Sequence, residues 1–469
     1  MSCAVALAEA GQRVRLFEKR PHLGGRATSY TLPDGSEVDN CQHLTLGCCT
    51  NLADFYHRVG AESKIRTYDR MYLMDRHGVT STIKAGFLPP PLHLAGSMMG
   101  FRALSRADKR GIVAALMSVA RAGGSPAGIE GITMLEWLQR MRQTPEAISR
   151  FWRVVLVSAL DEELDRAEAR YGIDVFWKTF LANRRGSLIG LPSAPLAELY
   201  EGCGEAIARQ GGEVKLRAGA REIQVSAGRF AGVAFEDGNQ ARAEACVAAV
   251  PFDVLAELVP QEMAEPGGPL EGLRGLRTSP ITSIHLWYDR TVMSTPYLAL
   301  IDHTVQWIFN KTYLYANVET NGAGLRPKET KADRQYLQLV ISASYDLVRR
   351  PRQEIIELCV RELAEIFPAT LNAKLLKATV IKEVHATFSP TPGVDRLRPT
   401  ADSGVPGLYF AGDFTRTGWP STMEGAVRSG YAAAESVLAS FGVKRKFLQP
   451  DLAPEGLSLW WARQKGTAL

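Results

Sequence analysis

The stretch Val14–Ala27 reads VRLFEKRPHLGGRA and carries two features of a dinucleotide-binding unit. A short apolar strand over Val14–Phe17 ends at an acidic residue, Glu18, and a glycine pair, Gly24 and Gly25, follows in the next turn. In such a βαβ unit, an acidic side chain at the end of the second strand hydrogen-bonds the adenosine ribose. The stretch therefore predicts the second strand of a Rossmann-like unit, with Glu18 in contact with a ribose.

The residues before this strand predict a helix of small side chains over Met1–Gly11. A G-x-G-x-x-G turn is expected just before that helix, because its N–H groups and the helix N-terminus hold the pyrophosphate. The given sequence starts inside the helix. We therefore expect that the first strand and the phosphate loop are missing from it, or that Met1 is an internal methionine. On that expectation, the chain as given binds a dinucleotide weakly.

The composition is that of an ordinary globular protein. The 469 residues suffice for about two to three domains, and 46% of them are hydrophobic and 22% charged. The net charge of +5 is spread out, so we expect no nucleic acid partner.

Seven cysteines without a C-x-x-C pair, and no secretory signal, indicate reduced thiols in a cytoplasmic protein. No spacing of histidines or carboxylates is typical of a metal site.

Segments typical of a dinucleotide-binding domain alternate with long insertions. The dinucleotide-type segments are 1–72, 196–258 and 385–441. The insertion 73–195 has the apolar spacing of helices, whereas 259–384 is rich in strand-like stretches. The pattern predicts an α/β protein with two discontinuous domains, one for a cofactor and one for a substrate, followed by a C-terminal tail over 442–469.

A second informative block is GLYFAGDFTRTGWPSTMEGAVRSGYAAAE, residues 407–435. An apolar strand over Leu408–Ala411 leads into Gly412 and Asp413, and a helix begins near Ser421–Glu424. Gly412 lets a ligand approach the backbone, and a carboxylate there can accept hydrogen bonds from a ribityl chain. The start of the helix points N–H groups at the electron-rich pyrimidine end of a flavin. The alternative is a simple strand–turn–helix crossover with a capping aspartate.

Four blocks together resemble the flavin-dependent amine oxidase and phytoene desaturase superfamily, and within it the hydroxysqualene dehydroxylases, also called squalene-associated FAD-dependent desaturases. The blocks are LGGRA (Leu23–Ala27), VDNCQHLTLG (Val38–Gly47), ATFSPTPGVDRLRP (Ala386–Pro399) and Gly412–Gly430. The resemblance implies FAD as cofactor. It also implies a Rossmann-like domain of the glutathione-reductase type, interleaved with an α+β substrate domain.

The resemblance also implies roles for individual residues. Glu18 binds the ribose, Gly24, Gly25 and Arg26 lie along the pyrophosphate, Ala220 meets the adenine, Gly412 and Asp413 meet the ribityl chain, and Met423, Glu424, Gly425 and Ala426 face the isoalloxazine. One position departs from the family pattern, because Cys41 stands where glycine is usual. A side chain at that point crowds any backbone that approaches the flavin.

The polar residues Asn40, Gln42 and His43 are predicted to lie over the flavin face. The substrate that the resemblance implies is a long apolar isoprenoid, so the few polar groups of its pocket are expected to act on the hydroxyl. His43 titrates near neutral pH and is the predicted proton donor to the leaving oxygen. The alternative is that His43 caps a turn. We expect His285 and His385 to be packed residues of strands.

Two segments indicate contact with a membrane surface. Ala85–Phe101 is uncharged and holds three consecutive prolines, so it cannot form one regular helix. Trp460 and Trp461 follow the basic run Lys444–Lys446, a pairing that suits a lipid interface. No apolar run reaches the roughly 20 residues that span a bilayer. We therefore expect a cytoplasmic protein attached peripherally to the inner face of the cell membrane. The alternatives are a core-packing loop and a disordered tail.

The function that these features favour is reductive removal of the hydroxyl of hydroxysqualene by reduced FAD to give squalene, a step of squalene and hopanoid biosynthesis. One alternative runs the same fold in the oxidative direction, as a carotenoid-type desaturase or another flavin oxidase. The other is a truncated, non-enzymatic paralogue without flavin. The sequence does not indicate the electron donor.

Overall fold

The structure is a computed structural model and describes residues 1–316, 318–321, 324–327 and 334–464. One half of the molecule contains two pairs of parallel strands. β1 (Arg15–Glu18) pairs with β9 (Glu213–Leu216), and β13 (Cys246–Ala248) pairs with β21 (Leu408–Phe410). The helices of this half are α1 (Ser2–Glu9), α2 (Thr50–Arg58), α9 (Glu201–Ala208), α10 (Phe252–Leu258), α11 (Gln261–Ala264) and α14 (Met423–Ser440). This half is the Rossmann-like domain that the sequence predicts.

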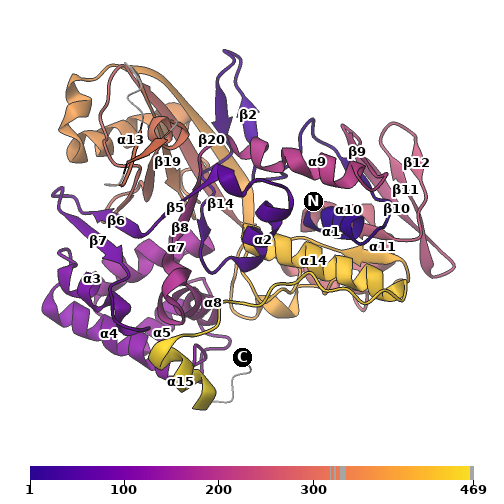
Figure 1. The fold of residues 1–469 in the computed structure, drawn as a ribbon, viewed down its shortest axis with the longest axis horizontal. Coiled ribbons are helices and arrows are strands. Elements are labelled where there is room, and N and C mark those ends of the chain that lie inside the picture. The colour runs from indigo at the N-terminus through magenta and orange to yellow at the C-terminus, as the bar shows by residue number, and fades with distance from the viewer. Residues whose placement is uncertain (317, 322–323, 328–333, 465–469) are drawn as a thin grey trace.

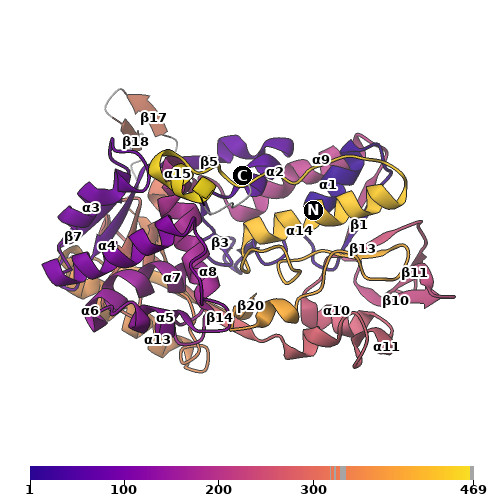
Figure 2. The ribbon, with the colours of Figure 1, turned by 90° about the horizontal axis from the view of Figure 1, so that it is seen from below.

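A small antiparallel sheet extends from this half at the right of Figure 1. Its strands are β10 (Ala220–Ser226), β11 (Arg229–Phe235) and β12 (Gln240–Ala241). The helices α1 and α14 lie side by side in both views (Figure 1, Figure 2). Gly430 makes this approach possible, because a Cβ there would lie 2.1 Å from the Oγ atom of Ser2.

The other half is built on a seven-stranded mixed sheet. Its strands, in spatial order, are β20 (Leu375–Phe388), β14 (Thr278–Tyr288), β19 (Gln335–Ile341), β16 (Trp307–Asn310), β15 (Tyr297–Leu300), β6 (Arg70–Met74) and β7 (Thr80–Lys84). The alternation of apolar and polar residues over Tyr72–Ile83, around His77 and Gly78, predicts a hairpin, and the β6–β7 pair confirms it. One face of the sheet is covered by α13 (Arg352–Ile366), whose Ile355, Cys359 and Leu363 are fully buried.

The helices of this half are α3 (Ala95–Gly100), α4 (Arg106–Arg121), α5 (Met134–Arg140), α6 (Pro145–Ala147), α7 (Arg153–Leu160), α8 (Ala169–Phe176), α12 (Lys311–Tyr315) and α15 (Gly456–Gln464). Of these, α3, α4 and α5 are labelled at the left of both figures. The remaining strands are short: β2 (Ser29–Thr31) with β3 (Glu37–Asp39), β4 (Thr45–Leu46) with β8 (Ile189–Pro192) and β5 (Ile65–Tyr68), and β17 (Val318–Asn321) with β18 (Gly324–Pro327).

The pattern over 133–158 reads as one helix in the sequence but forms several. Thr133 caps α5 together with Glu136, and Thr144 then caps a new helix whose first residue is Pro145. Proline is favoured at the first position of a helix and disfavoured inside one, so it separates the segments. A π-helical turn over Ile148–Trp152 leads into α7.

Two of the predicted domain boundaries fall inside strands. The boundary at 72/73 cuts β6 and the boundary at 384/385 cuts β20, and both strands belong to the seven-stranded sheet. The reason is that the residues on both sides of each boundary pair with the same neighbouring strand, β6 with β7 and β20 with β14. The C-terminal tail is also more ordered than the alternative of a disordered tail suggests. Its α15 is docked by bonds from the N–H groups of Leu457 and Ser458 to the carbonyl of Pro90, at 3.0 and 3.4 Å.

Candidate active site

A cavity of about 1520 Å³ runs between the two halves. All but one of the predicted site residues line it; the lining members are Glu18, Gly24, Gly25, Arg26, Asn40, Gln42, His43, Ala220, Gly412, Asp413, Met423, Glu424 and Ala426. The exception is Gly425, which is packed beneath the helix start, where a Cβ would lie 2.7 Å from the carbonyl of Pro420. Pockets of roughly 300–1,000 Å³ hold one drug-sized ligand. This cavity therefore has room for a dinucleotide and a second molecule.

Two glycines of the cavity wall are required by the backbone. Gly24 has φ +117°, and a Cβ there would lie 2.7 Å from the carbonyl of Ala27. Gly412 has φ +147°, and a Cβ there would lie 2.4 Å from the Phe414 ring. Residues with a side chain rarely adopt these two positive φ values. A side chain at either position would also close the space over the backbone. The wall is thus shaped for the close approach of a ligand.

An ion pair joins the two sequence blocks that predict the cofactor site. The guanidinium of Arg26 donates to a carboxylate oxygen of Asp413 at 2.5 Å, and the Ser421 hydroxyl donates to the other oxygen. Asp413 is 7% exposed, whereas the Arg26 side chain is 32% exposed, so only the carboxylate of the pair is shielded from water. The loop after β1 and the loop after β21 are therefore held together at the cavity wall.

Asn40 supports the same loop and also offers a free acceptor. Its amide nitrogen donates to the carbonyl of Arg26 at 2.8 Å and to the Glu383 carboxylate at 3.1 Å. Its Oδ1 atom is buried and has no hydrogen-bond partner among the described residues. Buried acceptors are nearly always satisfied, so this oxygen fits a ligand that donates an N–H or O–H into the cavity.

Arg398, which the sequence analysis did not single out, fixes the loop that carries Asp413. Its fully buried guanidinium donates to the carbonyls of Asp413 at 3.1 Å, Phe414 at 3.2 Å and Trp419 at 2.9 Å. It lies within the ATFSPTPGVDRLRP block, so the resemblance was the available signal. The loop geometry thus depends on an arginine that lies 15 positions before Asp413 in the chain.

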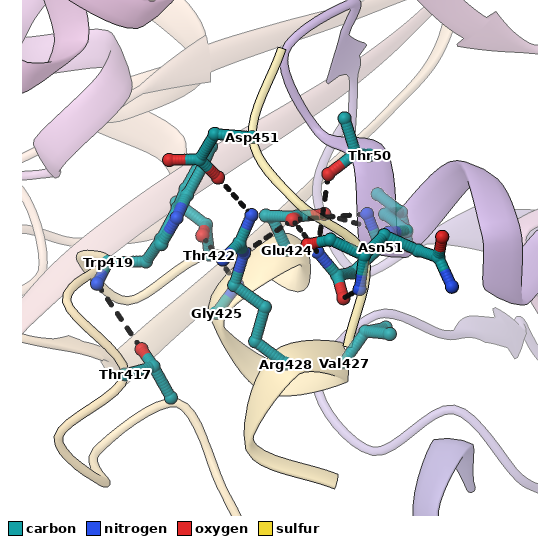
Figure 3. A network of polar contacts seen from close by, with 12 residues as sticks. Thr50, Asn51, Thr417, Trp419, Thr422, Glu424, Gly425, Val427, Arg428 and Asp451 are labelled. Carbon is teal, nitrogen blue, oxygen red and sulfur yellow. Dashed lines mark hydrogen bonds and ion pairs between the residues drawn. The ribbon is translucent and has the colours of Figure 1, made fainter. Parts of the chain in front are cut away.

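The side chain of Glu424 does not face the cavity as predicted. Its carboxylate accepts bonds from the backbone N–H groups of Asn51 and Leu52 at 3.2 and 2.7 Å, and from the Arg428 guanidinium at 2.7 Å (Figure 3). Those N–H groups belong to the first turn of α2, which has no intrahelical acceptor for them. Glu424 therefore caps α2 and ties it to α14, and only its backbone remains near the cavity.

A buried lysine that the sequence did not reveal orients Gln42. Lys311 donates to the Asp39 carboxylate at 2.6 Å and to the Gln42 side-chain carbonyl at 2.9 Å. Burial raises the pKa of Asp39, but Lys311 and hydrogen bonds from Leu196 and Tyr315 outweigh burial and hold that pKa below its usual value. Asp39 is thus a structural hydrogen-bond acceptor, and Lys311 fixes the amide of Gln42.

His43 lines the cavity, with its Nδ1 atom 3.3 Å from the carbonyl of Cys41. Burial lowers the pKa of His43, so its imidazole is neutral at pH 7. A neutral imidazole is a weak proton donor, which disfavours the predicted acid role. Cys41 is buried at the wall beside it. The expectation for His285 is confirmed, because it is buried in β14, whereas His385 is exposed on β20 and contacts Thr278.

The part of the cavity formed by the second half is mainly apolar. Its wall includes Val155, Val175, Phe180, Ile189, Trp307 and Phe309. Trp307 and Phe309 are stacked with ring centres 5.7 Å apart. We call this part the apolar arm. None of the residues 85–101 lines the cavity. In the described parts of the chain, no group of histidine, cysteine and carboxylate side chains is arranged to hold a metal ion.

A two-domain α/β protein with a dinucleotide-shaped cavity wall and an apolar arm is the architecture of a flavoprotein oxidoreductase. A family model described as flavin containing amine oxidoreductase matches residues 1–438. The chain belongs to this family, and its cofactor is FAD.

The curated relatives include carotenoid desaturases. The chain is 25% identical over 460 residues to the 15-cis-phytoene desaturase of Synechococcus elongatus, covering 94% of each chain. It is 24% identical to the zeta-carotene desaturase of Arabidopsis thaliana, over 93% of this chain and 83% of that protein. Among solved structures, an oxidoreductase from Methanosarcina mazei superposes with a TM-score of 0.69 at 17% identity, covering 93% of this chain and 97% of the other. Cyclohexylamine oxidase from Brevibacterium oxydans gives 0.63 at 15%, covering 94% and 97%.

Proposed function

We propose that the protein removes the hydroxyl of hydroxysqualene reductively and releases squalene. The observation that carries the proposal is the apolar arm, which continues from the cofactor wall in the same cavity. A long isoprenoid can lie in the arm with one carbon beside the flavin. This arrangement agrees with the resemblance of the four sequence blocks to hydroxysqualene dehydroxylases.

In this proposal the bound FAD supplies hydride chemistry, and the protein binds, orients and excludes water. Glu18 at the end of β1 is assigned to the ribose, and Ala220 at the start of β10 to the adenine. The paired Arg26 and Asp413 are assigned to the pyrophosphate and the ribityl chain. Gln42, fixed by Lys311, orients the substrate or the flavin edge.

The second candidate is oxidative desaturation of a carotenoid-type substrate. The relatives named above favour it, since several of them are desaturases. Both reactions need a flavin beside an apolar arm, so the arm alone does not separate them. Purified holoprotein incubated with hydroxysqualene or with phytoene separates them directly. Loss of hydroxysqualene with formation of squalene supports the proposal, whereas desaturation of phytoene without dehydroxylation refutes it.

We further propose a peripheral contact with an anionic membrane surface at the inner face of the cell membrane. The segment 85–101 and helix α15, which the sequence indicated separately, are bonded to each other through Pro90. Phe87 is 89% exposed and Trp460 is 54% exposed on these two elements. Exposed aromatic side chains suit insertion among headgroups. No helix in the described part of the chain is long and apolar enough to cross a membrane.

A further inference from the structure

A small polar group interrupts the apolar arm. Asp161, Ser158, Ser342 and Thr387 all line the cavity there. Asp161 follows the last residue of α7, and Ser158 lies on the same helix three positions earlier, hence on the same face. We call these four residues the polar subsite. Ser158 donates to the carbonyl of Val154 at 3.0 Å and accepts from the indole N–H of Trp307 at 2.7 Å, so the subsite is held by bonds within the protein. A ligand hydroxyl could use these polar atoms, whereas a hydrocarbon could not.

The backbone around the polar subsite is held in an unusual conformation. Asp161 and Ala343 both have φ +51°, and the N–H of Ala343 donates to the Asp161 carboxyl at 2.7 Å. The hydroxyl of Thr387 lies 2.8 Å from the other oxygen of the same carboxyl. Left-handed residues other than glycine are strained, alanine more than aspartate, and such strain gathers at active sites. The contacts therefore fix one carboxyl at the wall of the arm.

We propose that Asp161 is a catalytic residue that donates a proton to the hydroxyl of an isoprenoid alcohol bound at the polar subsite. The inference rests on the proposed function for its chemistry. It assigns the acid role to Asp161 in place of His43, and it selects an alcohol rather than a hydrocarbon as the substrate class.

The protonation state of Asp161 agrees with this assignment. The residue is 4% exposed, and burial raises the pKa of its carboxyl well above the usual value, with the nearby Glu162 adding to the effect. Hydrogen bonds from Ala343 and Thr387 act in the opposite direction but do not outweigh burial. The raised pKa of Asp161 favours the neutral carboxyl, which carries the proton that a leaving oxygen needs, whereas the lowered pKa of His43 favours the imidazole without that extra proton.

The step balances as follows. The C–O bond of the allylic alcohol breaks, and the oxygen leaves with the bonding electron pair. That oxygen takes the proton of Asp161 and becomes water. A reduced flavin bound beside the arm would supply the hydride to that carbon, so that the alcohol would be reduced to the hydrocarbon as the flavin is oxidised. The carboxylate of Asp161 then recovers a proton from solvent before the next turnover.

The first test measures ligand preference in the unaltered holoprotein. Farnesol and farnesene are an isoprenoid alcohol and its hydrocarbon counterpart, and their binding can be followed by the fluorescence of Trp307 in the wall of the arm. One hydrogen bond at the subsite predicts roughly two- to tenfold tighter binding of farnesol. Equal affinities would overturn the polar subsite. This measurement needs no variant, so it stands whether or not a substituted protein folds.

The second test uses Asp161→Asn with Asp174→Asn as the matched control. Asp174 is another carboxyl that lines the cavity, but its side chain is 26% exposed and lies beside Lys178 and Arg170 rather than at the polar subsite. Asparagine tolerates φ +51° and keeps the shape and the hydrogen bonds, but it has no acidic proton. We expect farnesol affinity within about threefold of wild type and dehydroxylation slowed about 10²–10⁴-fold. The assignment would be overturned if Asp161→Asn kept full turnover. It would also be overturned if Asp174→Asn slowed turnover to the same extent as Asp161→Asn.

The third readout does not depend on activity. The infrared difference spectrum between wild type and Asp161→Asn is expected to contain the carbonyl band of a neutral carboxylic acid. Absence of that band would mean that Asp161 is ionised and would overturn the acid role. If wild type shows the farnesol preference and the band but does not consume hydroxysqualene, the proposed function is refuted while the subsite and its acid are supported.

Discussion

Replacing Glu424 with alanine is expected to weaken the fold without weakening the binding of FAD to folded protein. The substitution leaves the N–H groups of Asn51 and Leu52 without an acceptor, and each such group costs about 1–3 kcal/mol. Arg428 keeps Asp451 as an ion-pair partner, so the loss of its bond to Glu424 costs little free energy. In total, Glu424→Ala is expected to lower the free energy of unfolding by about 3 kcal/mol. For a unit of 150–250 residues, each kcal/mol lowers Tm by about 2–4 °C, which gives roughly 6–12 °C.

The assay is thermal unfolding of flavin-free protein, followed by titration of the folded protein with FAD. The matched control is Ala426→Leu on the same helix, because Ala426 points into the cavity. That control is expected to keep the Tm of the flavin-free protein and to lose FAD affinity. The reasoning is refuted if Glu424→Ala keeps its Tm but fails to bind FAD, since the carboxylate would then act on the cofactor.

Three further outcomes are expected. Asp413→Ala removes the partner of Arg26 and is expected to lower FAD retention after gel filtration more than His43→Ala does; the reverse order would contradict the cofactor assignment. In holoprotein, His43→Ala is expected to change turnover less than about tenfold, because a neutral imidazole adds little as an acid, and a loss near 10³-fold would restore its acid role. Phe87→Glu with Trp460→Glu is expected to reduce co-sedimentation with anionic liposomes at unchanged flavin content. Leu371→Glu, at an equally exposed site (72%), serves as the control, and unchanged co-sedimentation in the double variant would contradict membrane contact.

The cofactor half of the site could be predicted from local sequence because its determinants are local. A few consecutive residues are enough to recognise a strand that ends in Glu18, or a glycine that must adopt positive φ. The hairpin of β6 and β7 is local for the same reason. These features depend on backbone geometry, which a short stretch of sequence largely specifies.

The residues that the sequence missed act through contacts that exist only in the folded protein. Lys311 reaches Asp39 across 272 positions of the chain, and Arg398 bonds the backbone of the loop after β21, which begins 15 positions later at Asp413. Asp161 looks in the sequence like a solvated residue at the end of a helix, and only the cavity gives it a role. The sequence motif predicts that Glu424 lies beside the cavity. It does not predict the direction of its side chain, which is bonded to α2, and for this reason Glu424 was misassigned.

The packing of α1 against α14 has a consequence for folding during synthesis. Helix α1 can complete its packing only after α14 has been synthesised. In the same way, β13 can pair with β21 only after β21 has been synthesised. Contacts between such distant parts form slowly, because a long loop must close before they add any stability. The apolar face of α1, with Val5 and Ala6 fully buried in the final fold, is therefore exposed while most of the chain is still being synthesised. During that interval the nascent protein is open to aggregation and depends on chaperones. Chains released before residue 430 would lack the surface that completes the cofactor domain.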